Sequence, residues 1–277
     1  MPRVWFITGC SRGLGLALVK AVLESGDIVI ATARNASSLN SIVKEYGTDR
    51  ILALSLDVTK EDQVHKTVNQ AKAAFGRIDL VVNNAGYAEI SPIEDVSFDS
   101  FRAQMETNFF GVVHVTKSIL PILRQQRSGH ILQVSSVGSR VGSPGLAAYQ
   151  SAKWAIGGFS TVLSKELAPF GVKVTVLEPG GMKTDWAGSS MVEGPLSEFY
   201  KQTVGASKKA RLKLSAGWPD PDAYARAIVY VSHIADPPLR LLLGSDTVEL
   251  AKQASSDLAA SDAKWHDLTT LNLVSQE

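Results

Sequence analysis

The sequence predicts an α/β protein built around a doubly wound parallel sheet, and two observations predict it. Short apolar runs alternate with longer amphipathic segments along most of the chain, which is the order of strand–helix units. The apolar runs are rich in Val, Ile and Leu at successive positions, as strands covered by helices on both faces should be. We expect strands near 4–8, 27–33, 51–56, 80–83, 130–135, 173–177 and 239–243, and helices near 13–25, 36–46, 60–75, 98–126, 147–169 and 222–235.

Length and composition are those of one globular domain, which we expect to span residues 1–277. Hydrophobic residues make up 45% and charged residues 20% of the chain, and the net charge of +1 gives no reason to expect a nucleic acid or membrane partner. No apolar run is long enough to span a bilayer, and no secretion signal precedes the first strand. A single cysteine, Cys10, favours a reducing compartment, so we expect a cytoplasmic protein. The five His residues lack metal-ligand spacing, and no metal is expected.

A glycine-rich turn follows the first predicted strand and opens a helix; it reads Thr8-Gly9-Cys10-Ser11-Arg12-Gly13-Leu14-Gly15. Glycines let the backbone approach a pyrophosphate, and a helix N-terminus supplies N–H groups and positive potential. The spacing G-x-x-x-G-x-G differs from the common G-x-G-x-x-G fingerprint, and plain turn chemistry is the alternative. The turn predicts a dinucleotide-binding loop whose cofactor contacts are Gly9, Ser11, Arg12, Gly13 and Leu14.

The ends of the second and third predicted strands indicate which dinucleotide is bound. An acid after the second strand would bind the adenosine ribose and favour NAD, but Ala33 stands there and Arg34 follows. Arg34 and Arg12 can converge on a 2′-phosphate, which predicts NADP(H) as the cofactor; two plain surface arginines are the alternative. Asp57, beside Val58, can accept from the adenine amino group, although helix capping by Asp57 is a rival interpretation.

One predicted helix places Tyr149 and Lys153 four residues apart, and therefore on the same face. A nearby ammonium stabilises the phenolate and lowers the pKa of tyrosine from about 10, which makes a proton donor or acceptor usable near neutral pH. The pair alone is a weak motif. It gains weight from polar and glycine residues at other strand ends and in one helix, which are Asn83-Asn84-Ala85-Gly86, Asn108, Ser135-Ser136, Pro179-Gly180 and Thr184.

Taken together, these residues resemble the short-chain dehydrogenase/reductase family. The pieces that match in order and spacing are Thr8-Gly9-x-x-x-Gly13-x-Gly15, Asn83-Asn84-Ala85-Gly86, Asn108, Ser136, Tyr149-x-x-x-Lys153 and Pro179-Gly180. The resemblance implies a single-domain Rossmann-type fold with a seven-stranded parallel sheet in the order 3-2-1-4-5-6-7. It also implies a catalytic tetrad, formed by Asn108, Ser136, Tyr149 and Lys153.

The resemblance further implies a role for each member of the tetrad. Ser136 would hold the substrate carbonyl, and Tyr149 would donate a proton as hydride arrives from NADPH. Lys153 would bind the nicotinamide ribose and lower the pKa of Tyr149, while Asn108 would hold a water that links Lys153 to solvent. The other expected cofactor contacts are Asn84, Ala85, Gly86, Pro179, Gly180, Met182 and Thr184.

The expected reaction is NADPH-dependent reduction of a ketone or aldehyde to an alcohol. Two alternatives stay open. One is an NADP-dependent alcohol dehydrogenase of the steroid or retinol type, which runs the same chemistry in reverse. The other is a non-catalytic NADP-binding regulator on the same fold.

Residues 181–222 depart from the strand–helix order, because about forty residues pass without a predicted strand. They follow the Pro179-Gly180 turn directly and include many large apolar side chains. We expect a substrate-binding lid that contributes Trp186 and faces Tyr87 and Val137, with a plain packing flap as the alternative. Only Lys183 and Arg140 are weak candidates for binding an anion. The expected substrate is therefore a medium-sized, largely apolar ketone or aldehyde.

The last predicted strand is followed by residues 245–277, which we expect to form a helical extension. Such an ending resembles the carbonyl reductase, retinol and 17β-hydroxysteroid dehydrogenase branch of the family. We expect the extension to occupy surface that the common tetramer uses, and the chain to be a monomer or a homodimer.

Overall fold

A computed structural model describes residues 1–183 and 191–271 of the chain. Its centre is a seven-stranded parallel sheet in the order β3-β2-β1-β4-β6-β7-β9. Counted within this sheet alone, the order is 3-2-1-4-5-6-7, and the predicted Rossmann-type topology is confirmed. The strands are β1 (Val4–Ile7), β2 (Ile28–Ala33), β3 (Ile51–Ser55), β4 (Leu80–Asn83), β6 (Gly129–Val134), β7 (Val172–Pro179) and β9 (Arg240–Leu243).

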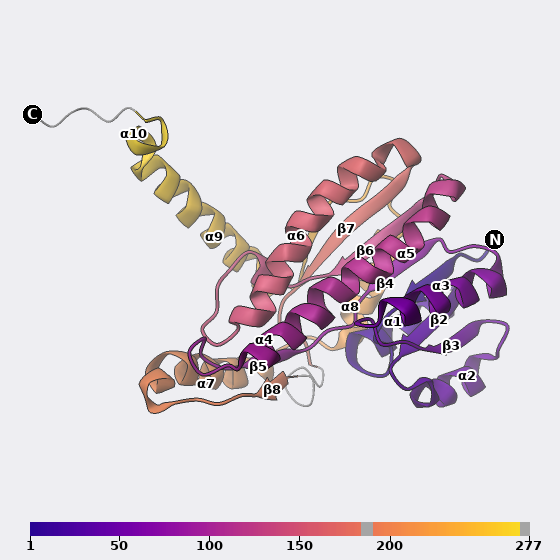
Figure 1. The fold of residues 1–277 in the computed structure, drawn as a ribbon, viewed down its shortest axis with the longest axis horizontal. Coiled ribbons are helices and arrows are strands. Elements are labelled where there is room, and N and C mark those ends of the chain that lie inside the picture. The colour runs from indigo at the N-terminus through magenta and orange to yellow at the C-terminus, as the bar shows by residue number, and fades with distance from the viewer. Residues whose placement is uncertain (184–190, 272–277) are drawn as a thin grey trace, which may run out of the picture.

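Helices cover both faces of the sheet (Figure 1). Alternate residues of β1 pack into two separate cores: Trp5 and Ile7 into one, Val4 and Phe6 into the other. This two-sided burial explains why the strand sequences are apolar at every position. The first core lies under α1 (Gly13–Glu24), α2 (Asn40–Tyr46) and α8 (Pro221–Val231), and the second under α3 (Glu61–Phe75), α5 (Gly111–Gln126) and α6 (Ala147–Leu167). Short 3₁₀ turns are η1 (Ala36–Leu39), η3 (Val137–Ser139) and η4 (Ala168–Phe170).

The single helix expected over 98–126 is three consecutive elements. These are α4 (Phe98–Met105), a π-helical turn η2 (Glu106–Phe110) and α5. A π-turn inserts an extra residue into a helix and is often found at functional sites. Here it places the fully buried Asn108 against the turn that follows β4.

The segment 181–222 contains a strand, and the expectation that it has none is wrong. β8 (Met191–Glu193) pairs in parallel with β5 (Ala88–Ile90), a second strand that the sequence did not predict. Both have three residues, too few to show the alternation that identifies a half-buried strand. The segment continues through η6 (Glu198–Tyr200), the π-turn η7 (Lys201–Gly205) and α7 (Ala206–Ser215).

The C-terminal extension is helical over α9 (Ser245–Lys264) and α10 (His266–Thr269). Figure 1 shows α9 projecting away from the body of the protein. Only its beginning is held, through buried Thr247 and Ala251, and every described residue from 255 onward is exposed. Asp246 Oδ2 accepts a hydrogen bond from Gly181 N at 3.0 Å, which joins α9 to the end of β7.

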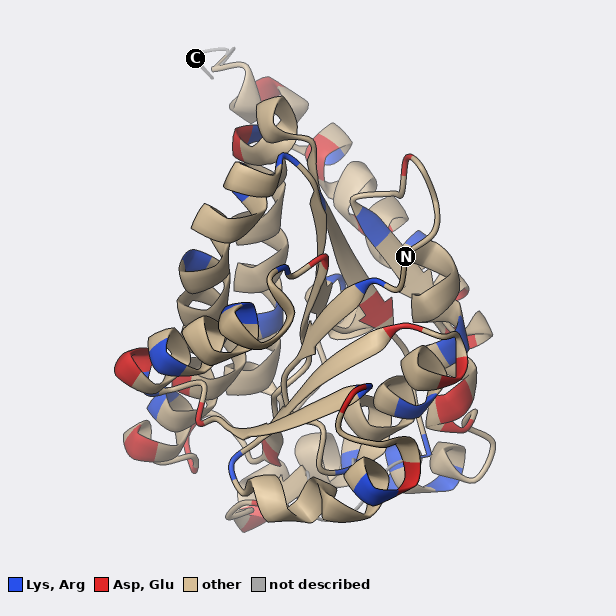
Figure 2. Cartoon of the chain, turned by 90° about the vertical axis from the view of Figure 1, so that its right-hand side faces the viewer, with Lys and Arg blue, Asp and Glu red and all other residues tan. Residues whose placement is uncertain are grey.

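Charged residues of both signs are interspersed along the elements of the chain in Figure 2. This mixture agrees with the net charge of +1. Among residues 1–183 and 191–271, no helix combines the length and apolar character needed to cross a bilayer.

Candidate active site

A cavity of about 850 Å³ lies at the carboxyl ends of the central strands, where open α/β sheets bind ligands. It brings together most of the predicted site residues, which are Gly9, Ser11, Arg12, Gly13, Leu14, Arg34, Asp57, Val58, Asn84, Ala85, Gly86, Tyr87, Ser136, Tyr149, Lys153, Pro179, Gly180 and Met182. Asn108 and Val137 do not line it. Thr184 and Trp186 lie outside the described residues.

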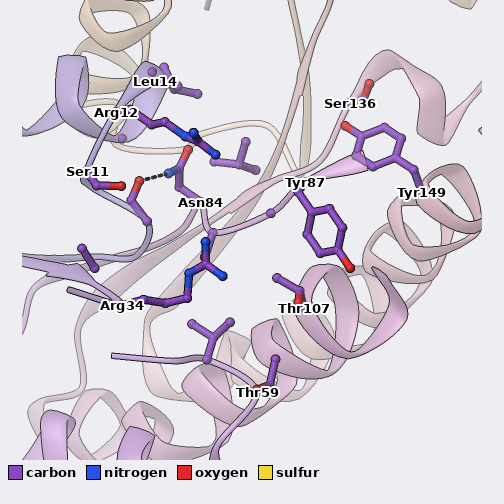
Figure 3. Close-up of a pocket in the computed structure, with 18 of the residues that line it drawn as sticks. Ser11, Arg12, Leu14, Arg34, Thr59, Asn84, Tyr87, Thr107, Ser136 and Tyr149 are labelled. Carbon is purple, nitrogen blue, oxygen red and sulfur yellow. Dashed lines mark hydrogen bonds between the residues drawn. The ribbon is translucent and has the colours of Figure 1, made fainter. Parts of the chain in front are cut away.

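The glycine turn packs directly against the turn that follows β4. Gly9 has φ +71°, and a Cβ there would lie 2.8 Å from Ala85 Cα. Thr8 Oγ1 accepts hydrogen bonds from Asn84 N at 2.9 Å and Ala85 N at 3.0 Å. Asn84 Nδ2 in turn donates to Gly9 O at 3.1 Å (Figure 3). These hydrogen bonds hold the two backbone turns side by side. The backbone that precedes α1 is left accessible, where a pyrophosphate could bind.

Two arginines point into one end of the cavity from different elements (Figure 3). Arg12 precedes α1, and Arg34 directly follows β2. Ala33, the last residue of β2, is 4% exposed, so the position where NAD-binding chains place an acid has a small apolar side chain. The pair fits a phosphate on the adenosine ribose.

Asp57 forms a turn with Thr59 and does not cap a helix. Its Oδ1 accepts from Thr59 N at 3.0 Å and from Thr59 Oγ1 at 2.8 Å. Lys60, and not Asp57, is the residue that precedes α3. The helix-capping interpretation is therefore wrong, and within residues 1–183 and 191–271 Asp57 Oδ2 has no hydrogen-bond partner.

The predicted catalytic tyrosine, lysine and serine meet at the other end of the cavity. Tyr149 and Lys153 are 6% and 4% exposed, on one face of α6. Lys153 Nζ donates to Val134 O at 2.7 Å and lies 5.5 Å from the centroid of the Tyr149 ring. The side chain of Ser136 hydrogen-bonds the Tyr149 hydroxyl, and Figure 3 shows the two hydroxyl groups directed toward one another.

Burial is the largest influence on the pKa of Tyr149, and the expected lowering of this pKa is not present. Burial raises the pKa of Tyr149 to about 12, while the Ser136 hydrogen bond and the Arg211 charge act in the opposite direction. Burial also lowers the pKa of Lys153 to about 8. The Lys153 ammonium is directed to the Val134 carbonyl oxygen, 5.5 Å from the centroid of the Tyr149 ring. Tyr149 is consequently a neutral acid in the structure.

Asn108, in the π-turn η2, hydrogen-bonds the backbone of Tyr87 in the turn after β4. Its Oδ1 accepts from Tyr87 N at 2.9 Å, and its Nδ2 donates to Tyr87 O at 2.8 Å. The amide thus holds the turn after β4 in place. An amide has a second proton and a second acceptor site, and the water-holding role implied by the resemblance would have to use these.

A buried carboxylate lies beneath the turn that follows β6 and joins it to the end of β7. Glu178, with no exposed surface, accepts from Ser139 Oγ at 2.8 Å, Arg140 Nε at 2.7 Å and Arg240 Nε at 2.8 Å. Ser139 belongs to η3, which Ser136 directly precedes as its N-cap, and Glu178 precedes Pro179 in β7. Arg140 is therefore engaged by Glu178, so it is not the anion-binding candidate that we considered.

One cation near Tyr149 was missed by the sequence analysis. Arg211 of α7 is half-buried, and its guanidinium is close enough for its charge and the Tyr149 hydroxyl to act on each other. The two residues are far apart in sequence, and their approach depends on packing of the lid segment. No motif or local periodicity could have indicated it. Among the described residues, no group of three or more His, Cys, Asp or Glu side chains could hold a metal ion.

Comparison with known proteins agrees with this geometry. The family model described as short chain dehydrogenase matches residues 3–193. Oxidoreductase BOA17 of Botryotinia fuckeliana is 54% identical over 270 residues, which cover 97% of this chain and 98% of that protein.

Solved structures give the same result. The crystal structure of a short-chain dehydrogenase from Streptomyces avermitilis aligns with a TM-score of 0.92 at 32% identity, over 98% of each chain. An alcohol dehydrogenase from Thermococcus sibiricus, solved with 5-hydroxy-NADP, aligns with a TM-score of 0.73 at 27% identity, over 88% of this chain and 96% of that one. The chain therefore belongs to the short-chain dehydrogenase family of oxidoreductases.

Proposed function

We propose that this protein is an NADPH-dependent carbonyl reductase that converts a ketone or aldehyde to an alcohol, with Tyr149 as the proton donor. One observation supports this most directly: a buried, neutral Tyr149 hydroxyl is hydrogen-bonded to Ser136 at the end of a dinucleotide-sized cavity. A neutral phenol can give a proton to a developing alkoxide. The reverse reaction would use the same residues, with the phenolate as the base, so the supply of NADPH and carbonyl compound would set the direction.

Residues of this chain fit NADPH along the length of the cavity. The glycine turn offers its backbone to the pyrophosphate, and Arg12 and Arg34 would hold the 2′-phosphate through charge-assisted bonds. Lys153 and Tyr149 would hold the nicotinamide ribose, near Pro179 and Gly180. NADPH, when bound, supplies the hydride.

Each remaining step belongs to a side chain. Ser136 and Tyr149 would bind the carbonyl oxygen together and place the carbon for hydride transfer. Tyr149 would then release its proton to that oxygen. Lys153, whose pKa is lowered to about 8, can exchange protons near neutral pH and would restore the Tyr149 proton, with water held near Asn108 as the source.

The lid over residues 181–222 would close the substrate side of the site. Met182 and Val192 line the cavity from this segment, and Tyr87 faces it from the turn after β4. These side chains give an apolar wall, which supports a substrate with a medium-sized apolar body.

We further propose a cytoplasmic homodimer that pairs through the exposed apolar side chains at the end of α9 and in α10. Leu258 of α9, Trp265 at its C-cap and Leu268 of α10 are 64%, 54% and 51% exposed, so large apolar side chains gather at this end of the chain. Light scattering on the protein and on Leu258→Glu should give a dimer and a monomer. A monomer or tetramer for the unaltered chain would refute the proposal.

The function is tested by NADPH oxidation against a panel of ketones, aldehydes and sugars, with NADH in parallel. We expect turnover of carbonyl compounds and a marked preference for NADPH. Absence of turnover with every carbonyl, together with tight NADPH binding, would instead support the non-catalytic regulator.

A further inference from the structure

The lid helix α7 is anchored next to the catalytic tyrosine. Val204, just before α7, is 4% exposed and packs in an apolar cluster that contains Tyr149, Ile90 and Leu146. A Cβ on Gly145 would lie 2.7 Å from Val204 Cγ1, so the segment fits closely at this point. The position of α7 relative to Tyr149 is therefore fixed by buried contacts.

One side of the segment that contains Val204 and α7 faces the candidate active site. Lys208 and Arg211 are three residues apart in α7 and therefore lie on one side of that helix, while Val204 precedes them in the π-turn η7. Val204 contacts the Tyr149 cluster, and Lys208 Nζ pairs with Glu193 Oε2 of β8 at 2.6 Å. Arg211 continues the row, is half-buried, and interacts electrostatically with the Tyr149 hydroxyl.

Arg211 has no carboxylate partner within residues 1–183 and 191–271. The acids near the lid are engaged elsewhere: Glu193 with Lys208, Glu89 with the Ser100 hydroxyl, and Glu94 with the Tyr200 hydroxyl at 2.6 Å. A partly desolvated cation without a counter-charge is unfavourable, and a guanidinium is shaped to bind a carboxylate through two parallel bonds.

The cofactor does not account for this charge. Arg211 is not among the residues that line the dinucleotide cavity, whose cations are Arg12, Arg34, Lys60 and Lys153. Tyr149 belongs both to the wall of that cavity and to the apolar cluster beside α7. Arg211 thus approaches the tyrosine from the lid side, where the substrate would enter.

We propose that Arg211 binds a carboxylate of the substrate, close to the carbonyl that Tyr149 protonates, and that the enzyme prefers keto acids to neutral ketones. The inference rests on the proposed function and refines its substrate class. It also revises the expectation of a largely apolar substrate, which was drawn because no suitable cation lies near the tetrad in sequence. The apolar wall still fits the body of such a molecule.

The test compares aryl keto acids, with the carboxylate one, two or three carbons from the carbonyl, with their methyl esters. We expect kcat/KM with NADPH to favour at least one acid over its ester by about ten- to a hundred-fold, the range of a charge-assisted pair. Arg211→Gln should abolish this ratio and Arg211→Lys restore part of it. The matched control is Lys209→Gln, an exposed cation of the same helix, which should keep the ratio.

Binding of a non-reducible arylcarboxylate to the NADP⁺ complex, measured by calorimetry, gives a readout that needs no turnover. Affinity should fall about ten-fold or more in Arg211→Gln and persist in Lys209→Gln. The inference is overturned if every acid and its ester have equal kcat/KM, or if carboxylate binding does not depend on Arg211. If ketones are nevertheless reduced, the proposed function still stands. Arg211-dependent binding without turnover of any carbonyl would instead refute the proposed function and support the anion site.

Discussion

Arg240 Nε donates to the Glu178 carboxylate at 2.8 Å, and this bond joins the edge strand β9 to β7 directly beneath the active-site turns. The same carboxylate receives Arg140 and Ser139 from the turn after β6. Three elements that frame the site therefore depend on one buried charge.

Glu178→Gln should destabilise the protein strongly. Removing one charge of a buried ion pair leaves the partners uncompensated, at a cost of about 3 kcal/mol. Urea unfolding at pH 7 measures the change in the free energy of unfolding. Glu198→Gln, which breaks the exposed pair with Lys201, serves as the control and should change stability little. Equal stability of Glu178→Gln and the unaltered protein would contradict the structural role.

Tyr149→Phe should lower kcat about 10²–10⁴-fold, because the variant lacks the proposed general acid. NADPH binding, followed by fluorescence titration, should persist. Tyr230→Phe, at an exposed position of α8, is the matched control and should retain normal kcat. Turnover of Tyr149→Phe within a few-fold of normal would exclude this residue as the proton donor.

Arg34→Gln should raise the KM for NADPH about ten-fold or more and leave the KM for NADH nearly unchanged, because only NADPH has the 2′-phosphate. Adding Ala33→Asp should then favour NADH, since the new carboxylate can accept from the free ribose hydroxyls. Lys44→Gln, in α2 and away from the cavity lining, is the control. Equal use of both cofactors by the unaltered enzyme would refute this account of selectivity.

Lys153 should make stability depend on pH in the cofactor-free protein. Its pKa is lowered from 10.5 to about 8, so the unfolded chain binds more protons than the folded one between these values. Relative to Lys153→Met, the unaltered protein should gain about 2–3 kcal/mol between pH 7 and pH 10. The raised pKa of Tyr149 acts with opposite sign, but only above about pH 10. Parallel pH profiles of unfolding for the two proteins would show that Lys153 is not held in an unfavourable charged state.

The sequence predicted those features that local patterns encode. Two-sided apolar strands such as Val4–Ile7 and the fixed spacings around Tyr149 led to the sheet order, the family and most of the cavity wall. The paired strands β5 and β8 were missed, because three residues are too short for a periodic signal and their partner is distant in sequence.

Properties set by tertiary environment could not be predicted. The pKa of Tyr149 depends on its burial, and the Lys153 ammonium is directed to the Val134 carbonyl. Arg211 acts on Tyr149 across the fold, in a segment whose Val204 packs beside that tyrosine. The π-turn around Asn108 likewise leaves no recognisable sequence pattern.

The hydrogen bond between Asp246 and Gly181 links the C-terminal helix to the backbone beside the proposed active site. Asp246, in the first turn of the C-terminal helix, holds the backbone immediately after Pro179-Gly180, while the far end of the helix projects away from the body (Figure 1). A change in the position of that protruding helix, caused by an attached tag or a docked neighbour, is therefore expected to move the backbone at Gly181, beside the proposed nicotinamide site. Trimming the chain before Ser245 would consequently alter turnover and assembly at once, and Asp246→Asn alone would separate the two effects.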